Sequence, residues 1–151
     1  MDPFDKLWYI LYPMYPMMTY NSLYNLFLLL DIYVKVTLYE GGRVIKAKKT
    51  RQLSCSEVLD FNEKFSIRLP ASYLNNVSCL VSLCSRNKYG LKAVMGRTNV
   101  GPFAFANGQG DQFRPVQTSS DHAMLGLEHW QQMIQSGEEV VKWHKMISNF
   151  S

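Results

Sequence analysis

A hairpin of two contrasting strands is the feature of this sequence that most restricts its fold. Residues 33–39 place an apolar side chain at every second position, which is the period of a half-buried β-strand. Gly41 and Gly42 follow at once, and glycine tolerates the positive φ angles of a tight turn. The chain must then return antiparallel through residues 43–51, so this region predicts antiparallel β-structure.

The returning strand is strongly cationic. It carries five positive charges and no negative one in nine residues. These residues are Arg43, Lys46, Lys48, Lys49 and Arg51. The whole chain has 16 Lys and Arg and a formal net charge of +4, so the charge is concentrated here and indicates an anionic partner. A solvated face kept for solubility is the alternative, and nucleic acid is not expected because no aromatic interleaving or nucleic-acid motif accompanies the strand.

Further strand patterns follow. Residues 61–69 put Phe61, Phe65, Ile67 and Leu69 on one face before Pro70 ends the run. Strands are also predicted over residues 77–83, around residues 94–95 and over residues 140–144, with a polar loop over residues 85–92.

One helix is expected late in the chain. Residues 101–122 are rich in Gly, Gln, Ser and Asn and read as a long loop. Apolar residues then recur at helical spacing over residues 125–136, and Gly137 suits a helix C-terminus. Several short strands with one short helix near the C-terminus predict an all-β, antiparallel sandwich.

Composition limits the classes of function. At 151 residues the chain suits one compact domain. Its three cysteines, Cys55, Cys79 and Cys84, are odd in number and show no CxxC spacing, which favours free thiols in a reducing compartment. The histidines at 122, 129 and 144 do not combine with them at zinc-binding spacing, and no catalytic constellation is present. We therefore expect no metal, no cofactor and no enzyme activity.

The N-terminal segment leaves two alternatives open. Residues 7–30 carry no charge and are long enough to cross a bilayer. They also contain Pro13, Pro16 and several polar residues, and they lack the features of a signal peptide. We favour extra core strands over a membrane span for residues 1–30, with a domain over 31–147 and a tail over 148–151.

Five motifs together carry a family resemblance. They are Asp31-Ile32-Tyr33-Val34-Lys35-Val36, Lys46-x-Lys48-Lys49-Thr50, Phe61-Asn62-Glu63-Lys64-Phe65, His129-Trp130-Gln131-Gln132-Met133 and Trp143-His144-Lys145-Met146. Their order resembles that of the second C2 domain of synaptotagmins over about 117 residues (31–147). The resemblance implies an eight-stranded C2 β-sandwich. Residues 1–30 resemble neither of the two strands that open this domain in the family, so they are either replacement strands or the mark of a truncated or alternatively spliced product.

The resemblance also bears on calcium. A C2 calcium site needs several Asp carboxylates, because Ca²⁺ takes six to eight oxygen ligands. Here Asp31 is the one acidic residue retained, while Ser85, Asn87 and Ala93 stand at the other acidic positions and Arg86 adds a positive charge. The chain is therefore similar to the calcium-independent members. Asp31 itself is better explained as a residue that hydrogen-bonds backbone amides at the start of a strand.

The partners follow from the resemblance. Lys46, Lys48 and Lys49 align with a polybasic strand that resembles a site for phosphoinositides, SNARE proteins and the clathrin adaptor. This implies a role in exocytosis at the cytoplasmic face of a vesicle or plasma membrane, with homo- or hetero-oligomers with other synaptotagmins as a further possibility. A lipid-independent module that docks SNAREs or oligomerises is the alternative. Trp143 and His144 are weaker candidates for partner docking, and Trp130, Met133 and Trp143 are expected to be buried.

Overall fold

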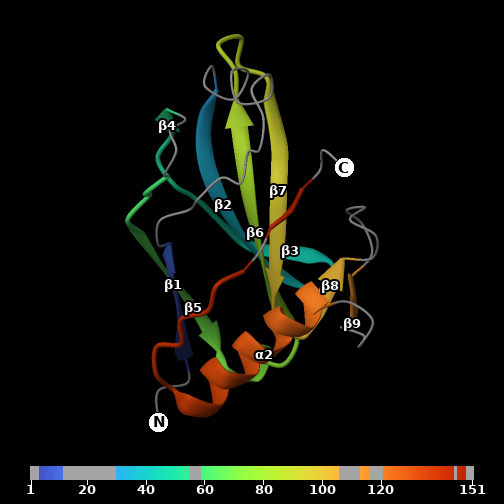
Figure 1. Cartoon of the computed structure of the whole chain (residues 1–151). Helices are drawn as coiled ribbons and strands as arrows, with labels where there is room; N and C mark the ends of the chain where they lie inside the picture. The colour runs from blue at the N-terminus through green and yellow to red at the C-terminus, as the bar shows by residue number, and fades with distance from the viewer. Residues whose placement is uncertain are drawn as a thin grey trace.

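The computed structural model describes residues 4–11, 30–54, 59–105, 113–115, 121–144 and 146–148 (Figure 1). Within them the chain is mainly antiparallel β-structure. The strands are β1 (Phe4–Leu11), β2 (Asp31–Glu40), β3 (Arg43–Lys49), β4 (Leu53–Ser54), β5 (Glu63–Pro70), β6 (Val77–Arg86), β7 (Lys92–Val100), β8 (Phe103–Phe105), β9 (Phe113–Pro115) and β10 (Ile147–Ser148). A 3₁₀ turn, η1 (Ala71–Tyr73), follows β5, and the helix α2 covers Asp121–Ser136.

The larger sheet has the strand order β10-β7-β6-β2-β3, and the short strand β4 extends the β3 edge by pairing with β2. Its β2–β3 hairpin confirms the opening prediction. Gly41 and Gly42 have φ angles of 57° and 85°, which only glycine adopts readily. A β-bulge between Leu38 and Tyr39 shifts the register of this hairpin near the turn.

The smaller sheet pairs the N-terminal strand β1 with β5, from Phe4 opposite Pro70 to Leu11 opposite Glu63. Part of the N-terminal segment is therefore a strand, as the favoured alternative proposed. Residues 12–29 lie outside the described residues. Among the described residues, no helix combines the length and the apolar character needed to cross a bilayer.

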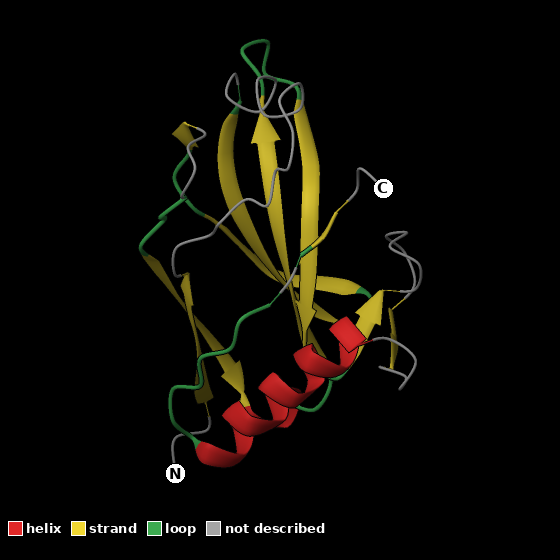
Figure 2. Ribbon diagram, in the orientation of Figure 1, coloured by secondary structure: helices red, strands yellow, loops and turns green. Residues whose placement is uncertain are grey.

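The core lies between these two sheets. Val34, Val36 and Leu38 on the inner face of β2 are fully buried, and the predicted apolar face of β5 is also buried. Figure 2 shows the two groups of strands with α2 across the lower end of the large sheet. This arrangement confirms the antiparallel β-class with a helix near the C-terminus, and it is consistent with a C2 β-sandwich.

Helix α2 begins four residues earlier than predicted, and its C-terminus is confirmed. Gly137 has a φ of 64°, and its N–H donates to the Met133 carbonyl oxygen at 3.1 Å. Trp130 is 2% exposed, and its indole N–H donates to the Leu74 carbonyl oxygen at 3.1 Å. This residue fastens the helix to the sandwich, as expected.

Two sequence predictions need correction. The loop predicted over residues 101–122 contains the paired strands β8 and β9 and the first two residues of α2. The strand predicted over residues 140–144 is wrong, because these residues have no regular structure and the terminal pairing with β7 is made by Ile147 and Ser148. The physical reason is that His144 and Val140 contact His129 on the helix, and Val141 between them is left 58% exposed.

A candidate anion-binding face

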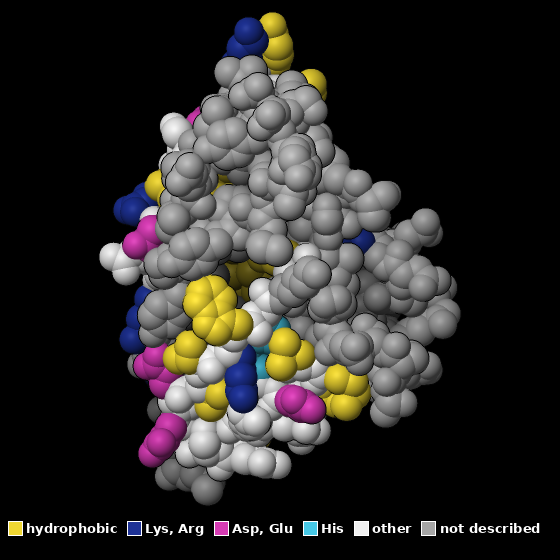
Figure 3. Space-filling model, viewed as in Figure 1, with side chains coloured by type: hydrophobic (Ala, Val, Ile, Leu, Met, Phe, Trp, Pro, Cys, Tyr) yellow, Lys and Arg dark blue, Asp and Glu magenta, His cyan; other side chains and the backbone are white. Residues whose placement is uncertain are grey.

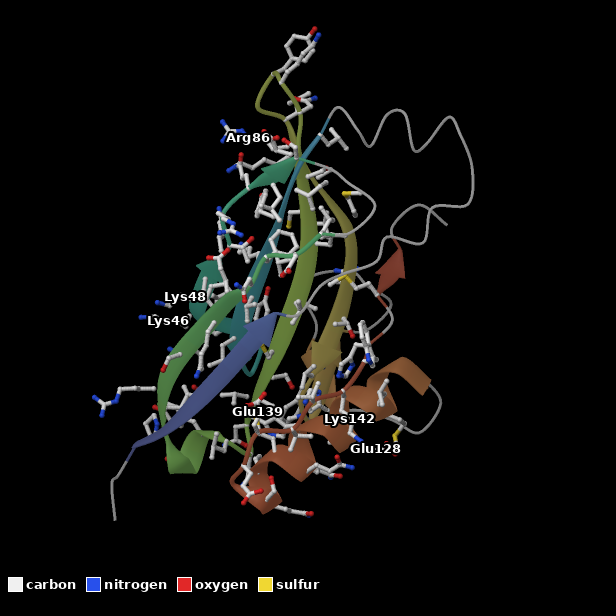
Figure 4. The ribbon with its side chains drawn as sticks, turned by 60° about the vertical axis from the view of Figure 1, so that its left-hand side comes forward. Lys46, Lys48, Arg86, Glu128, Glu139 and Lys142 are labelled. Atoms are coloured by element: carbon white, nitrogen blue, oxygen red, sulfur yellow. The ribbon has the colours of Figure 1, made fainter. Side chains whose placement is uncertain are left out.

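The register of the β2–β3 ladder divides the basic strand between two faces. Directly opposed residues of antiparallel strands share a face. Lys49 pairs with Lys35 on the outer face of the sheet, whereas Lys48 pairs with the buried Val36 and so belongs to the core side. Lys46 lies two residues from Lys48 and shares its face. Figure 4 shows Lys46 and Lys48 projecting together from the edge of the sheet, where they reach solvent.

One arginine of the predicted set is paired with a carboxylate. The Arg43 guanidinium lies 3.6 Å from the Glu40 carboxylate, which offsets its charge. Arg51 lies two residues after the end of β3, and its backbone N–H donates to the Glu63 carboxylate at 2.9 Å. The β2–β3 register places Lys49 on one face of the sheet and Lys46 and Lys48 on the other.

A second set of cations gathers on the outer face of the large sheet. The β2–β6 and β6–β7 ladders place Lys35 in line with Ser82 and Arg97, and they place Asp31 in line with Arg86 and Lys92. The cations that share this face are Lys35, Lys49, Arg86, Lys92 and Arg97. Asp31 is the one acidic residue that the described ladders place there, at one end.

The floor of this outer face is neutral. Tyr33 and Cys84 are both buried there, and the Lys49 ammonium lies 5.8 Å from the centroid of the Tyr33 ring. Burial raises the pKa of the Tyr33 phenol and of the Cys84 thiol above their ordinary values. The nearby charges of Lys35, Lys49 and Lys92 act in the opposite direction on the pKa of Cys84. The face is therefore a layer of cations over uncharged side chains.

The positions compared with a calcium site lie at the upper end of the sheet. Asp31 is exposed and faces Arg86 across the β2–β6 ladder. Ser85 is 5% exposed and pairs with the buried Ile32, so it belongs to the core side. Ala93 offers no side-chain oxygen. Among the described residues, no group of three or more His, Cys, Asp and Glu side chains lies together where a metal ion could be held.

Asn87 has a structural role at the β6–β7 turn. Its side-chain oxygen accepts hydrogen bonds from the backbone N–H groups of Tyr89 and Leu91, both at 2.9 Å. This fixes a turn whose Tyr89 and Leu91 side chains are 77% and 69% exposed, with the Lys88 ammonium 5.1 Å from the Tyr89 ring centroid. Figure 3 shows a basic and a hydrophobic side chain side by side at the top of the molecule, where Figure 1 places this turn.

The C-terminal candidates differ from expectation. Trp143 is 72% exposed, so the prediction that it is buried is wrong. The residue follows an irregular segment instead of a strand, and no sheet covers it. His144 contacts His129 on α2, with 2.7 Å between their ring nitrogens. Met133 is partly buried against the core, as expected.

Sequence reasoning missed Lys35, Arg86, Lys92 and Arg97 as members of one face. They come from three strands, and their charges are separated along the sequence by apolar residues. The alternation of side chains within its strand already indicated that Lys35 points outward. Only the pairing between strands shows that the other three share its face.

No protein-family model matches the chain. Individual relatives do match. The chain is 29% identical over 117 residues to synaptotagmin-1 of Caenorhabditis elegans, which covers 77% of this chain and 22% of the relative. It is 29% identical over 117 residues to human synaptotagmin-5, covering 77% of this chain and 26% of the relative. It is 30% identical over 115 residues to synaptotagmin-11 of Rattus norvegicus, covering 76% of this chain and 23% of the relative.

The two antiparallel sheets and the late helix define a β-sandwich module consistent with the C2 class. The similarity makes the chain a homologue of the synaptotagmins, consistent with a synaptotagmin C2 domain. The chain spans about a quarter of the length of these curated relatives.

Proposed function

We propose that this chain is a C2 module of vesicle trafficking that binds anionic phospholipid, with phosphoinositides preferred, and does so without calcium. The observation that carries the proposal is the outer face described above, where five cations from four strands lie over a neutral floor. A cation near an anionic leaflet gains about 1 kcal/mol, so several together hold a membrane reversibly. In this proposal the chain is a binding module and not an enzyme.

Three observations support calcium independence. Arg86 stands opposite Asp31 in the β2–β6 ladder and adds a positive charge at this end of the sheet. The oxygen of Asn87 is already used by two backbone N–H groups. Ser85 belongs to the core side. This set of side chains does not match the oxygen-rich shell that Ca²⁺ requires. Calorimetry should detect no Ca²⁺ binding at micromolar concentrations, and a micromolar site would overturn this part of the proposal.

Vesicle co-sedimentation tests the lipid proposal. We compare vesicles of neutral lipid, of neutral lipid with phosphatidylserine, and of neutral lipid with phosphoinositide, at moderate salt. The double variant Lys35→Ala/Lys49→Ala should weaken binding roughly 30-fold, because two cations contribute about 2 kcal/mol. The matched control Lys46→Ala/Lys48→Ala removes the same charge from the other face and should have a smaller effect.

Two outcomes would contradict the proposal: an absence of binding to any anionic vesicle, or a double variant at Lys35 and Lys49 that binds as the parent does. An equal loss in both double variants would show that net charge, and not this face, determines binding.

A second candidate is a protein-docking module for SNAREs, the clathrin adaptor or another synaptotagmin. The observation that favours it is the pair Lys46 and Lys48, which projects from the sheet edge away from the outer face. An acidic protein surface suits such a pair. If this function is the principal one, Lys46→Ala/Lys48→Ala abolishes capture by acidic SNARE proteins, while vesicle binding by the unmodified chain is absent.

A further inference from the structure

Two histidines that are 15 residues apart in sequence meet at the lower end of the molecule. His129 lies on α2, and His144 lies in the irregular segment that follows the helix. The Nδ1 atom of His129 is 2.7 Å from Nε2 of His144, and the ring centroids are 5.0 Å apart with 20° between the ring planes. The Nε2 atom of His129 is also 2.9 Å from the Val140 carbonyl oxygen. Both contacts join the helix to the same segment.

These contacts define where the protons must be. A carbonyl oxygen only accepts a hydrogen bond, so Nε2 of His129 carries a hydrogen and donates it to Val140. In the neutral ring Nδ1 of His129 is then an acceptor, and the hydrogen between the rings belongs to Nε2 of His144. The result is a chain of two hydrogen bonds that runs from His144 through His129 to the backbone. It requires a neutral His129.

Each added proton has a different effect. A first added proton can bind to Nδ1 of His144. It leaves both hydrogen bonds in place, but it puts a positive charge on a partly buried ring. Burial, and then the neighbouring His129, lower the pKa of His144 to about 4. A proton at Nδ1 of His129 would remove the acceptor and set two cationic rings edge to edge. The closed pair thus resists protons that the open segment can take up, so falling pH favours opening.

The charged groups around the pair come from α2 and from the segment that follows it. Glu128 is the neighbour of His129 on α2, and Glu138, Glu139 and Lys142 lie on the segment after the helix. Figure 4 shows Glu128, Glu139 and Lys142 in this lower part of the molecule. Because acids and bases are both present, the pair is not held neutral or charged by one dominant partner.

Val140 and His144 connect this segment to α2. Residues 138–144 have no helix or strand, and the residues between these two contacts are open to solvent, with Val141 58% and Trp143 72% exposed. We propose that His129 and His144 form a proton-operated latch, which holds residues 138–144 against α2 while the pair is neutral and releases them as the pair takes up protons. Release changes the position of Trp143, the largest exposed apolar side chain of this region.

Hydrogen exchange on the full chain tests the latch. After correction for the intrinsic rate, peptides from residues 137–144 should lose about tenfold or more of their protection as pH falls from about 6.5 to about 4. Peptides from β2 and β6 should stay protected over the same range. A segment whose protection does not change with pH would overturn the proposal.

Three variants sharpen this test. His144→Phe keeps an aromatic ring but has no N–H, so the segment should be open already at pH 7.5 and should show no pH step. His144→Gln keeps a donor for His129 and should restore closure at pH 7.5, which also guards against a folding defect in the first variant. His122→Gln removes a histidine outside the pair and should leave the step unchanged. A His144→Phe chain with the parent's pH step would show that other groups open the segment.

Discussion

At the residue scale, Thr50 shows how a single side chain sets the end of the basic strand. Its backbone N–H donates to the Val34 carbonyl oxygen, and its hydroxyl oxygen accepts the Val34 N–H, both at 2.9 Å. The hydroxyl in turn donates to the Arg51 carbonyl oxygen at 2.8 Å. The side chain thus replaces a missing backbone partner after the last residue of β3. Lys49, which precedes it, is held in the register that puts it beside Lys35.

Thr50→Val should destabilise the fold. Valine has nearly the same shape but no hydroxyl, so the Val34 N–H would be buried without a partner, at a cost of about 1–3 kcal/mol. Urea unfolding measures the change, and Thr50→Ser, which keeps the hydroxyl, should lose less. Equal stability of the valine variant and the parent would show that water or another group satisfies Val34.

At the scale of elements, the contact of α2 with β7 depends on a glycine. A Cβ atom at Gly126 would clash with the backbone carbonyl oxygen of Asn99. The backbone N–H of Gly101 also donates to the Gly126 carbonyl oxygen at 3.3 Å, so the helix backbone lies directly against the end of the strand. A side chain at this position would lift the helix and loosen Trp130, which is buried beneath it.

Gly126→Ala should therefore be destabilising, although alanine favours helices by about 1 kcal/mol over glycine. Overpacking against rigid backbone costs about 1–3 kcal/mol or more, and it outweighs the gain in propensity. Thermal unfolding checks the sign. Gln132→Ala on the exposed side of the same helix is the control and should be neutral within about 0.5 kcal/mol. A more stable Gly126→Ala chain would contradict this close packing.

The elements also show what the sequence could predict. The alternation in β2, the Gly41-Gly42 turn and the apolar face of β5 are local patterns, and all three are confirmed. The composition of the outer face is not local. A bulge between Leu83 and Cys84 shifts the β6–β7 register by one residue. Odd-numbered residues of β7 therefore point to the outer face on one side of the bulge, and even-numbered residues do so on the other side. No spacing in the sequence indicates that bulge, so Lys92 and Arg97 could not be assigned together.

The strand predicted over residues 140–144 was wrong for a different reason. Val140, Val141 and Trp143 have high β-propensity, and propensity alone predicted a strand. In the structure a side-chain contact by His144 and a backbone contact by Val140 tie the segment to the helix instead. Tertiary contacts of this kind depend on how α2 is placed, which the segment itself does not encode.

At the scale of the whole molecule, the outer face of the large sheet makes stability depend on alkaline pH. Burial raises the pKa of Cys84 above 9.0 and the pKa of Tyr33 and of Tyr39 above 10.0. A group whose folded pKa is raised contributes stability that is complete below its unfolded pKa and is lost as pH rises through its folded pKa. The folded state holds these protons longer than the unfolded chain does.

Stability should therefore be constant with respect to these groups below about pH 9 and should fall as pH rises above it. Urea unfolding at a series of pH values from 8 upward measures the slope. Cys84→Ser should reduce the loss of unfolding free energy that begins near pH 9, because it removes the thiol. Cys79→Ser tests the effect of losing a different buried thiol. A free energy of unfolding that rises above pH 9 would contradict this assignment.

The pairing of β1 with β5 has a consequence for the order in which the molecule assembles. Leu11 and its partner Glu63 are far apart along the chain, and Phe4 and Pro70 are farther still. A contact between distant residues must first overcome the entropy of closing the intervening loop, whereas the β2–β3 hairpin closes through two glycines. We expect the hairpin to form early and the small sheet late. During synthesis, β1 would then leave the ribosome before its partner β5 has been made.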